Sequence, residues 1–230
     1  MNDSPGNSGA IEIITLPTGP SKSFLILGAR PILVDTGLPG NSEIILSALR
    51  EHSLDPRDLA LIVITHAHID HTGSAAALKK ATGAPVLIHT KDAGYLRNGG
   101  SAPARPNALL GRLLGLFIGS KKPDPALALE PDIVIDGEYP LDAFGIPGRI
   151  IPAPGHTFGS IAVVLPGTAC LCGDLVMGML PATRPRISIF AEDPGEIIRS
   201  IRTILDTNTP VIYTGHGGPF SSQSVEELIR

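Results

Sequence analysis

The chain has few of the residues that mark several common protein classes. Its 230 residues include no tryptophan and only 4% aromatic residues, so a core must be built mainly from Ile, Leu, Val and Ala. It has only two cysteines, Cys170 and Cys172, which excludes a disulfide framework because such near neighbours on a strand rarely bridge each other. We therefore expect a reducing compartment and a cytoplasmic protein.

Long runs of basic or apolar residues are also missing. No basic run extends beyond the doublets at 79–80 and 121–122, and the formal net charge is −4, which disfavours nucleic acid as a partner. No apolar run is long enough to span a membrane. The first ten residues are polar and lack the basic and then apolar pattern of a signal peptide, so residues 1–10 are expected to form a disordered tail.

Short apolar stretches alternate with helical patterns along residues 11–230. The strand-like stretches cover residues 11–15, 23–28, 31–37, 59–64, 85–89, 132–136, 148–154, 160–166, 169–174 and 211–218, and the helical patterns cover 41–52, 74–83, 193–206 and 224–230. Each half of the chain thus has strands with a few helices between and after them. This order predicts one layered α/β domain with helices outside packed sheets. An apolar insertion at about 98–125 separates the halves.

The sequence THAHIDH, residues 65–71, is the strongest chemical signal. It follows an uncharged strand-like run, and burying four titratable side chains there would be costly unless something compensates, as a metal ion does directly. His66 and His68 are alternate residues of a loop and project the same way, so they can hold one ion together. Asp70 and His71 point elsewhere and suit a second ion close by.

Three further polar residues follow apolar strands later in the chain. His156 lies in APGHTFGS and can complete the first site, and His216 lies in YTGHGG and can complete the second. Asp174, which ends a buried strand, could bridge both ions. The other two histidines lack this setting: His52 is expected at an exposed helix end, and His89 is expected to pack at the end of a strand.

These motifs, from LVDTG (33–37) through THAHIDH, APGHTFGS and CGD to TGHGG, resemble those of the metallo-β-lactamase superfamily in order and spacing. The resemblance implies a four-layer αβ/βα sandwich with two metal ions at one edge. It implies His66, His68 and His156 on one ion, with Asp70, His71 and His216 on the other and Asp174 shared. Asp35 matches an early aspartate of the family that supports the ligand loop, although a plain turn residue is an equal interpretation.

The resemblance also implies a reaction: hydrolysis of an ester-like bond, such as a thioester, a lactone or another carboxylic ester. Two divalent ions, zinc before iron or manganese, would activate a bridging hydroxide for the attack. Asp70 would help to orient this nucleophile as a catalytic residue. The shared aspartate resembles the glyoxalase II and lactonase branches, while phosphodiesterase or β-lactamase activity on the same site is an alternative.

The insertion leaves two interpretations open. Leu109, Leu113, Leu116 and Phe117 have helical spacing, and an apolar lid over the metals would suit a small substrate with an acyl part. The same stripe could instead pack on the core or form a homodimer.

An oxidoreductase is the main rival class. Persulfide dioxygenases share the HxHxDH pattern but use one iron ion, so metal analysis and oxygen uptake would separate the two activities.

Overall fold

A computed structural model of the chain describes residues 11–109, 111–113, 122–178 and 184–230. Within these ranges the strands form two mixed six-stranded sheets and one two-stranded ribbon. The first sheet has the order β1 (Glu12–Leu16), β2 (Ser23–Leu27), β3 (Ile32–Val34), β4 (Leu61–Val63), β5 (Val86–His89) and β6 (Ile133–Ile135). Strands β3 to β6 are parallel, whereas β1, β2 and β3 pair antiparallel.

The second sheet is built from the later part of the chain. Its order is β14 (Phe220–Ser221), β13 (Val211–Tyr213), β10 (Ala169–Leu171), β9 (Ile161–Leu165), β8 (Arg149–Pro152) and β7 (Tyr139–Pro140). Only β10 and β13 pair in parallel among these strands. Strands β11 (Val176–Gly178) and β12 (Pro185–Ile187) pair antiparallel as a separate ribbon.

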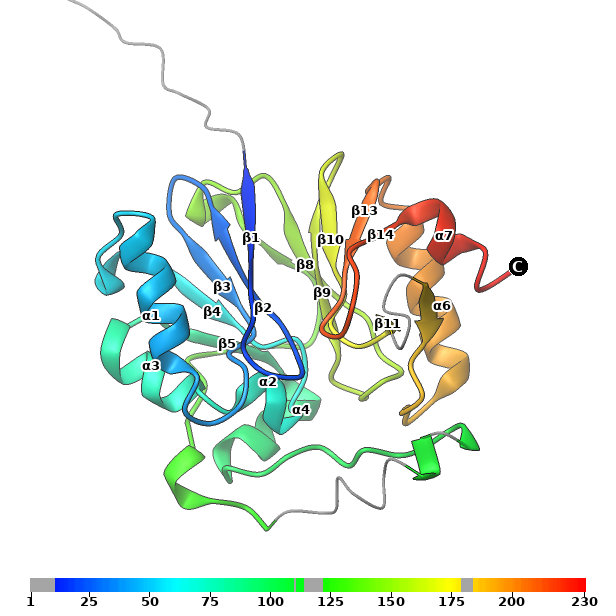
Figure 1. Cartoon of the computed structure of the whole chain (residues 1–230), viewed down its shortest axis with the longest axis horizontal. Coiled ribbons are helices and arrows are strands. Elements are labelled where there is room, and N and C mark those ends of the chain that lie inside the picture. The colour runs from blue at the N-terminus through cyan, green and yellow to red at the C-terminus, as the bar shows by residue number, and fades with distance from the viewer. Residues whose placement is uncertain (1–10, 110, 114–121, 179–183) are drawn as a thin grey trace, which may run out of the picture.

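The two sheets face each other and helices cover their outer sides (Figure 1). The helices are α1 (Ser42–Glu51), α2 (Ile69–Thr72), α3 (Ala75–Thr82), α4 (Thr90–Arg97), α6 (Pro194–Leu205) and α7 (Ser222–Glu226). Three clusters of buried apolar side chains match the interfaces of such a stack: one under α1, α3 and α4, one between the sheets, and one under α6 and α7. This is the predicted αβ/βα sandwich.

Local sequence accounts for several helix boundaries. Asp193 accepts hydrogen bonds from the backbone N–H groups of Gly195 and Glu196, and Pro194 occupies the first turn of α6, as its sequence predicts. Helix α3 ends at Gly83, whose φ of +74° is a left-handed conformation that glycine adopts without strain.

Two local features do not follow from the sequence pattern. Asn41 or Ser42 could have capped helix α1, but the N-cap residue Asn41 makes no side-chain capping hydrogen bond, and its amide donates to the backbone carbonyl of Thr18. Helix α4 was not predicted, since its short sequence TKDAGYLR places only Ala93 and Leu96 on an apolar face.

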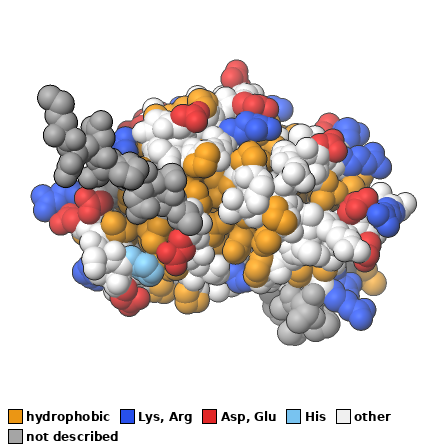
Figure 2. Space-filling view, turned by 90° about the horizontal axis from the view of Figure 1, so that it is seen from above, with side chains coloured by type: hydrophobic (Ala, Val, Ile, Leu, Met, Phe, Trp, Pro, Cys, Tyr) orange, Lys and Arg blue, Asp and Glu red, His pale blue; other side chains and the backbone are white. Residues whose placement is uncertain are grey.

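Seen from above, charged side chains of both signs alternate around a face where hydrophobic atoms also reach the surface (Figure 2). Among the described residues of this face, Lys and Arg are dispersed among Asp and Glu rather than gathered into a broad basic patch. None of the helices in the described ranges is both long and apolar enough to span a bilayer.

Candidate metal centre

The candidate ligands meet at one edge of the sandwich. Helix α2, which carries two of them, lies near the lower ends of the strands in Figure 1. Most occupy connections that leave the ends of strands: His66 follows β4, His156 follows β8, Asp174 follows β10 and His216 follows β13, while Asp35, which is not a candidate ligand, follows β3. Asp70 and His71 lie on the short helix α2. The fold therefore brings together residues that are up to 150 positions apart, from His66 to His216.

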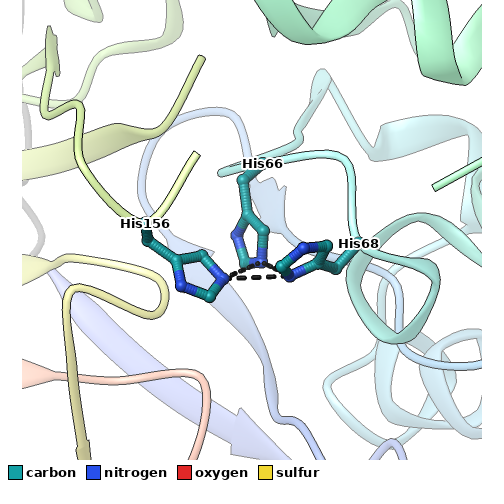
Figure 3. Close-up of side chains that lie close together, drawn as sticks. All are labelled: His66, His68 and His156. Carbon is teal, nitrogen blue, oxygen red and sulfur yellow. Dashed lines mark hydrogen bonds between the residues drawn. The ribbon is translucent and has the colours of Figure 1, made fainter. Parts of the chain in front are cut away.

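Three imidazoles converge on one point (Figure 3). His156 Nε2 lies 3.2 Å from His66 Nε2 and 2.9 Å from His68 Nδ1, and His66 Nε2 lies 3.1 Å from His68 Nδ1. The rings of His66 and His156 are buried, and His68 is 9% exposed. This geometry places three ring nitrogens around a single small space.

The outer hydrogen bonds of two of these rings fix their tautomers. His156 Nδ1 lies 2.8 Å from the carbonyl oxygen of Phe190, which can only accept, so Nδ1 donates and Nε2 presents a lone pair. The hydroxyl of Thr65 donates to the Asp35 carboxylate and accepts from His66 Nδ1 at 3.1 Å, so His66 Nε2 also presents a lone pair.

Facing lone pairs repel each other unless a cation lies between them. His68 Nδ1–H can donate a hydrogen bond to only one of its two neighbours. The lone pairs of His66 Nε2 and His156 Nε2 still face each other. Buried polar atoms without a hydrogen-bond partner are unusual, yet among the described residues His71 Nε2 and Asp174 Oδ1, which lie 3.5 Å apart, have none. The donor set fits a borderline divalent cation, which accepts lone pairs from imidazole and carboxylate groups.

A second group of ligand atoms adjoins the first. His216 Nε2 lies 3.2 Å from Asp70 Oδ2 and 3.2 Å from Asp174 Oδ2, and His71 Nε2 lies 3.5 Å from Asp174 Oδ1. Possible ligand atoms of Asp70, His71 and His216 all lie within 4.8 Å of one another, and the same holds for His66, His71 and Asp174. Asp174 therefore lies between the two groups, and His66 contacts both.

Close backbone approach explains one glycine of this region. Gly215 precedes His216, and a Cβ atom there would clash with the Asp174 carboxylate and the His71 ring. Only glycine lets the backbone before His216 approach the other ligands this closely.

Electrostatics differ between the two groups. In the metal-free protein, burial and then the charge of nearby His71 lower the pKa of His66, and burial and then His156 lower the pKa of His68 to about 3. By contrast, the Asp174 carboxylate raises the pKa of His216 to about 10. Burial also lowers the pKa of His156, so the first group is neutral at pH 7. In the second group the pKa of His71 is raised well above its usual value, against the effect of its burial, by the Asp35 carboxylate, so His71 and His216 both hold protons that a bound cation would displace.

The lowered pKa of His68 predicts that this residue contributes acid sensitivity to the metal-free protein, whereas the raised pKa of His216 makes a contribution that falls as the pH rises above about 6.5. Below pH 6.5 the unfolded chain binds a proton that folded His68 accepts only near pH 3, so stability is present above pH 6.5 and is lost as the pH falls through this window. Each such group contributes a slope of about 1.4 kcal/mol per pH unit. Urea unfolding with chelator between pH 5 and pH 7 measures this slope. His68→Gln should make it shallower, and an unchanged slope would contradict the prediction.

Asp35 organises the ligand loop from behind. It is fully buried, and its carboxylate accepts hydrogen bonds from the Thr65 N–H at 2.8 Å, from the Thr65 hydroxyl and from His71 Nδ1 at 2.7 Å. Its φ of +61° is left-handed, a conformation that aspartate and asparagine tolerate better than most residues. These contacts favour the supporting role over that of a plain turn residue.

Asp35→Ala should destabilise the metal-free protein by about 3 kcal/mol or more, because several buried donors lose their acceptor. Asp35→Asn is the matched variant: it tolerates the backbone conformation but presents an NH₂ group to some of the same donors, so we expect an intermediate loss. Urea unfolding in the presence of chelator would measure both. Equal stability of Asp35→Ala and the wild-type protein would show that the contacts are not important.

The sequence interpretation missed several residues that form hydrogen bonds with the loops carrying the candidate ligands. Asp92 on α4 accepts from the Ala67 N–H at 2.7 Å and the Thr157 hydroxyl at 2.9 Å. Ser188 Oγ lies 3.1 Å from His156 Nδ1. In the sequence, only the polar character of these residues could have suggested such a role, because their hydrogen-bond partners are distant along the chain.

The turn between β1 and β2 also supports the site. Lys22 Nζ donates to the carbonyl of Gly218 at 3.0 Å and to that of Gly217, and the Ser21 hydroxyl donates to the carbonyl of Asp70. This turn thereby connects α2 to the loop that follows His216.

The insertion contacts both ligand-bearing halves. The Ala102 N–H donates to the Ala67 carbonyl at 2.7 Å, and the Asn107 side chain donates to the Ser188 carbonyl at 3.0 Å. Leu109 and Leu113 are 74% and 52% exposed, so these two side chains do not pack on the core. Leu116 and Phe117 lie outside the described residues.

The remaining histidines and the cysteines occupy other positions. His52 is exposed at the end of α1, and His89 ends β5, where its ring accepts a hydrogen bond from the Lys91 N–H at the start of α4. Cys170 and Cys172 are both free and buried.

Sequence comparison relates this geometry to known proteins. The profile of the Metallo-beta-lactamase superfamily matches residues 16–216. A probable metallo-hydrolase of Methanocaldococcus jannaschii is 28% identical over 201 residues, which are 86% of this chain and 87% of the relative. A hydroxyacylglutathione hydrolase of Albidiferax ferrireducens is 31% identical over 170 residues, 72% of this chain but 50% of that protein.

Solved structures with the same fold include several superfamily members. BLEG-1 B3 metallo-beta-lactamase superposes with a TM-score of 0.71 at 21% identity, covering 94% of this chain and 97% of that one. TTHA1623, solved in a di-iron-bound form, superposes with a TM-score of 0.67 at 24% identity, covering 94% and 98%. The profile match over most of the sequence, together with this fold, shows that the chain belongs to the metallo-β-lactamase superfamily.

Proposed function

We propose that the protein is a dinuclear metal-dependent hydrolase that cleaves an ester-like bond in a small molecule. The observation that carries this proposal is the pair of adjoining ligand groups with Asp174 between them. Zinc is the ion we expect first, because imidazole and carboxylate ligands suit it, while iron or manganese could use the same donors. When bound, two such ions supply Lewis acidity and lower the pKa of a water molecule to about 7.

The exposure of the ligands indicates where a substrate can enter. The side chains of Asp70 and His216 are 20% and 26% exposed, whereas those of His71 and Asp174 are at most 4% exposed. A substrate therefore approaches from the Asp70 and His216 side. At that side the Asp70 carboxylate can accept a hydrogen bond from an attacking water and orient it toward a carbonyl carbon.

The ester class rests on the relatives and the site together. Hydroxyacylglutathione is a thioester, and the relatives named for its hydrolysis share about half of their length with this chain. We therefore propose thioesters, lactones and other carboxylic esters as the substrate class, without assigning glutathione itself.

The exposed leucines of the insertion extend this proposal. Leu109 and Leu113 project from a segment that is hydrogen-bonded to the ligand loops, and we propose that they form part of a lid for an acyl chain, with a homodimer contact as the alternative. Each buried CH₂ group of a substrate would contribute about 0.8 kcal/mol. The two free, buried cysteines support a reducing, cytoplasmic compartment.

Metal analysis combined with a substrate panel tests the function. The panel contains thioesters and lactones of increasing acyl length, a phosphodiester and a β-lactam, each assayed with zinc-, iron- and manganese-loaded protein. We expect about two ions per chain and activity on the esters, rising with acyl length if the lid acts on the substrate. One iron ion per chain with oxygen consumption, or turnover of the phosphodiester or β-lactam alone, would contradict the proposal.

A further inference from the structure

A buried carboxylate joins the two loops that carry the three converging histidines. Asp92 lies on α4, is only 2% exposed and is not one of the candidate ligands. Its Oδ2 atom accepts from the Ala67 N–H at 2.7 Å and from the Thr157 hydroxyl at 2.9 Å. A single oxygen atom thus holds two segments that are 90 residues apart, from Ala67 to Thr157.

The two segments belong to different sheets. Ala67 lies between His66 and His68 in the loop after β4 of the first sheet, and Thr157 directly follows His156 in the loop after β8 of the second. The three nitrogens that face one another therefore come from two layers that could shift relative to each other. Their 2.9–3.2 Å spacing depends on contacts that fix one loop against the other.

The surroundings of Asp92 make this contact rigid. The Thr157 N–H donates to Ser160 Oγ at 3.0 Å, which holds the turn that presents the Thr157 hydroxyl. A Cβ atom at Gly159 would clash with the Asp92 carboxylate, so the backbone of the turn packs directly on it. On the other side, the Ala67 carbonyl accepts from the Ala102 N–H at 2.7 Å.

We propose that Asp92 is a positioning residue that sets the distance between the His66–His68 loop and the His156 loop, and thereby the affinity and geometry of metal binding by these three histidines. This inference rests on the proposed metal centre. A carboxylate suits the task because it only accepts hydrogen bonds and can receive several at once. One backbone bond, from the Ile161 N–H to the Thr65 carbonyl at 2.9 Å, also links the loops, so loss of Asp92 should weaken metal binding rather than abolish it.

Substitutions at Thr157 test the contact with little change in shape. Thr157→Val replaces the hydroxyl by a methyl group, whereas Thr157→Ser keeps the hydroxyl. Partners that orient metal ligands change metal affinity by about 10- to 100-fold when they are removed. We expect Thr157→Val to bind Co²⁺ and Zn²⁺ at least about tenfold more weakly in competition with a chelator and to shift the visible spectrum of bound Co²⁺. Thr157→Ser should restore both the affinity and the spectrum.

Asp92→Asn tests the carboxylate itself, with Asp132→Asn as the matched control. Asp132 also accepts from a backbone N–H, that of Val86 at 2.8 Å, and contacts Lys79, but it joins no ligand loop. Asp92→Asn should lower the affinity for Co²⁺ and alter its spectrum, while Asp132→Asn should leave both unchanged. Thermal unfolding of the metal-free variants separates these effects from general destabilisation.

The outcomes distinguish this inference from the proposed function. Wild-type protein that takes up neither Co²⁺ nor Zn²⁺ would overturn the metal centre and, with it, the role of Asp92. Wild-type protein that binds these ions, with Thr157→Val and Asp92→Asn binding equally tightly, would overturn only the role of Asp92. Equal weakening by Asp132→Asn would also overturn it. If Asp92→Asn fails to fold, the comparison of Thr157→Val with Thr157→Ser decides.

Discussion

Asp174→Asn should lower the hydrolytic rate of the metal-loaded protein by about 10³-fold, because Lewis acid catalysis contributes several kcal/mol and each 1.4 kcal/mol is a factor of ten. The Asp174 carboxylate lies near histidine nitrogens of both candidate ligand groups. Its Oδ2 lies 3.2 Å from His216 Nε2 and 3.8 Å from His156 Nε2, and its Oδ1 lies 3.5 Å from His71 Nε2. The amide of asparagine keeps the size of this side chain but removes its negative charge.

Metal content and activity should fall together in this variant. We expect fewer than two ions per chain, together with slower turnover of the best ester in the panel. Asp206→Asn, which changes an exposed carboxyl group at the end of α6, is the control and should match the wild-type protein. Full activity of Asp174→Asn with a normal metal content would show that catalysis does not need this carboxylate.

Removal of the metal ions should lower the melting temperature by about 8–16 °C. A ligand at a thousand times its dissociation constant stabilises the native state by about 4 kcal/mol, and 1 kcal/mol corresponds to about 2–4 °C for a chain of this size. The physical reason lies in the opposed lone pairs of His66 Nε2 and His156 Nε2, which a cation between them would satisfy.

Differential scanning calorimetry with and without a chelator measures this effect. Added zinc should restore the higher melting temperature, and the shift should grow with the zinc concentration, as expected for a ligand that binds the folded state. His156→Ala removes one donor and should reduce the shift. Identical melting curves for chelated and zinc-loaded protein would exclude a metal contribution to stability.

Local patterns in the sequence were sufficient to predict the layers of the fold. Apolar runs such as 59–64 and the helix pattern of 193–206 have the periods of a buried strand and an amphipathic helix, and both elements form where they were predicted. Helix α4 was not predicted from the sequence, because its eight residues present only a short apolar face and therefore show little helical periodicity. This helix carries Asp92, and its position depends on packing against the first sheet.

The sequence by itself determined which side chains could bind metal, because imidazole and carboxylate chemistry is a property of residue type and the ligands follow strands that local patterns reveal. Only the tertiary structure decided how these side chains are held: the Phe190 carbonyl fixes the tautomer of His156, Asp35 orients His71, and Asp92 joins the two loops. These contacts link residues that are 25 to 65 positions apart, and no periodicity in the sequence encodes such distances. They arise only when the two sheets pack and bring the ends of their strands to one edge.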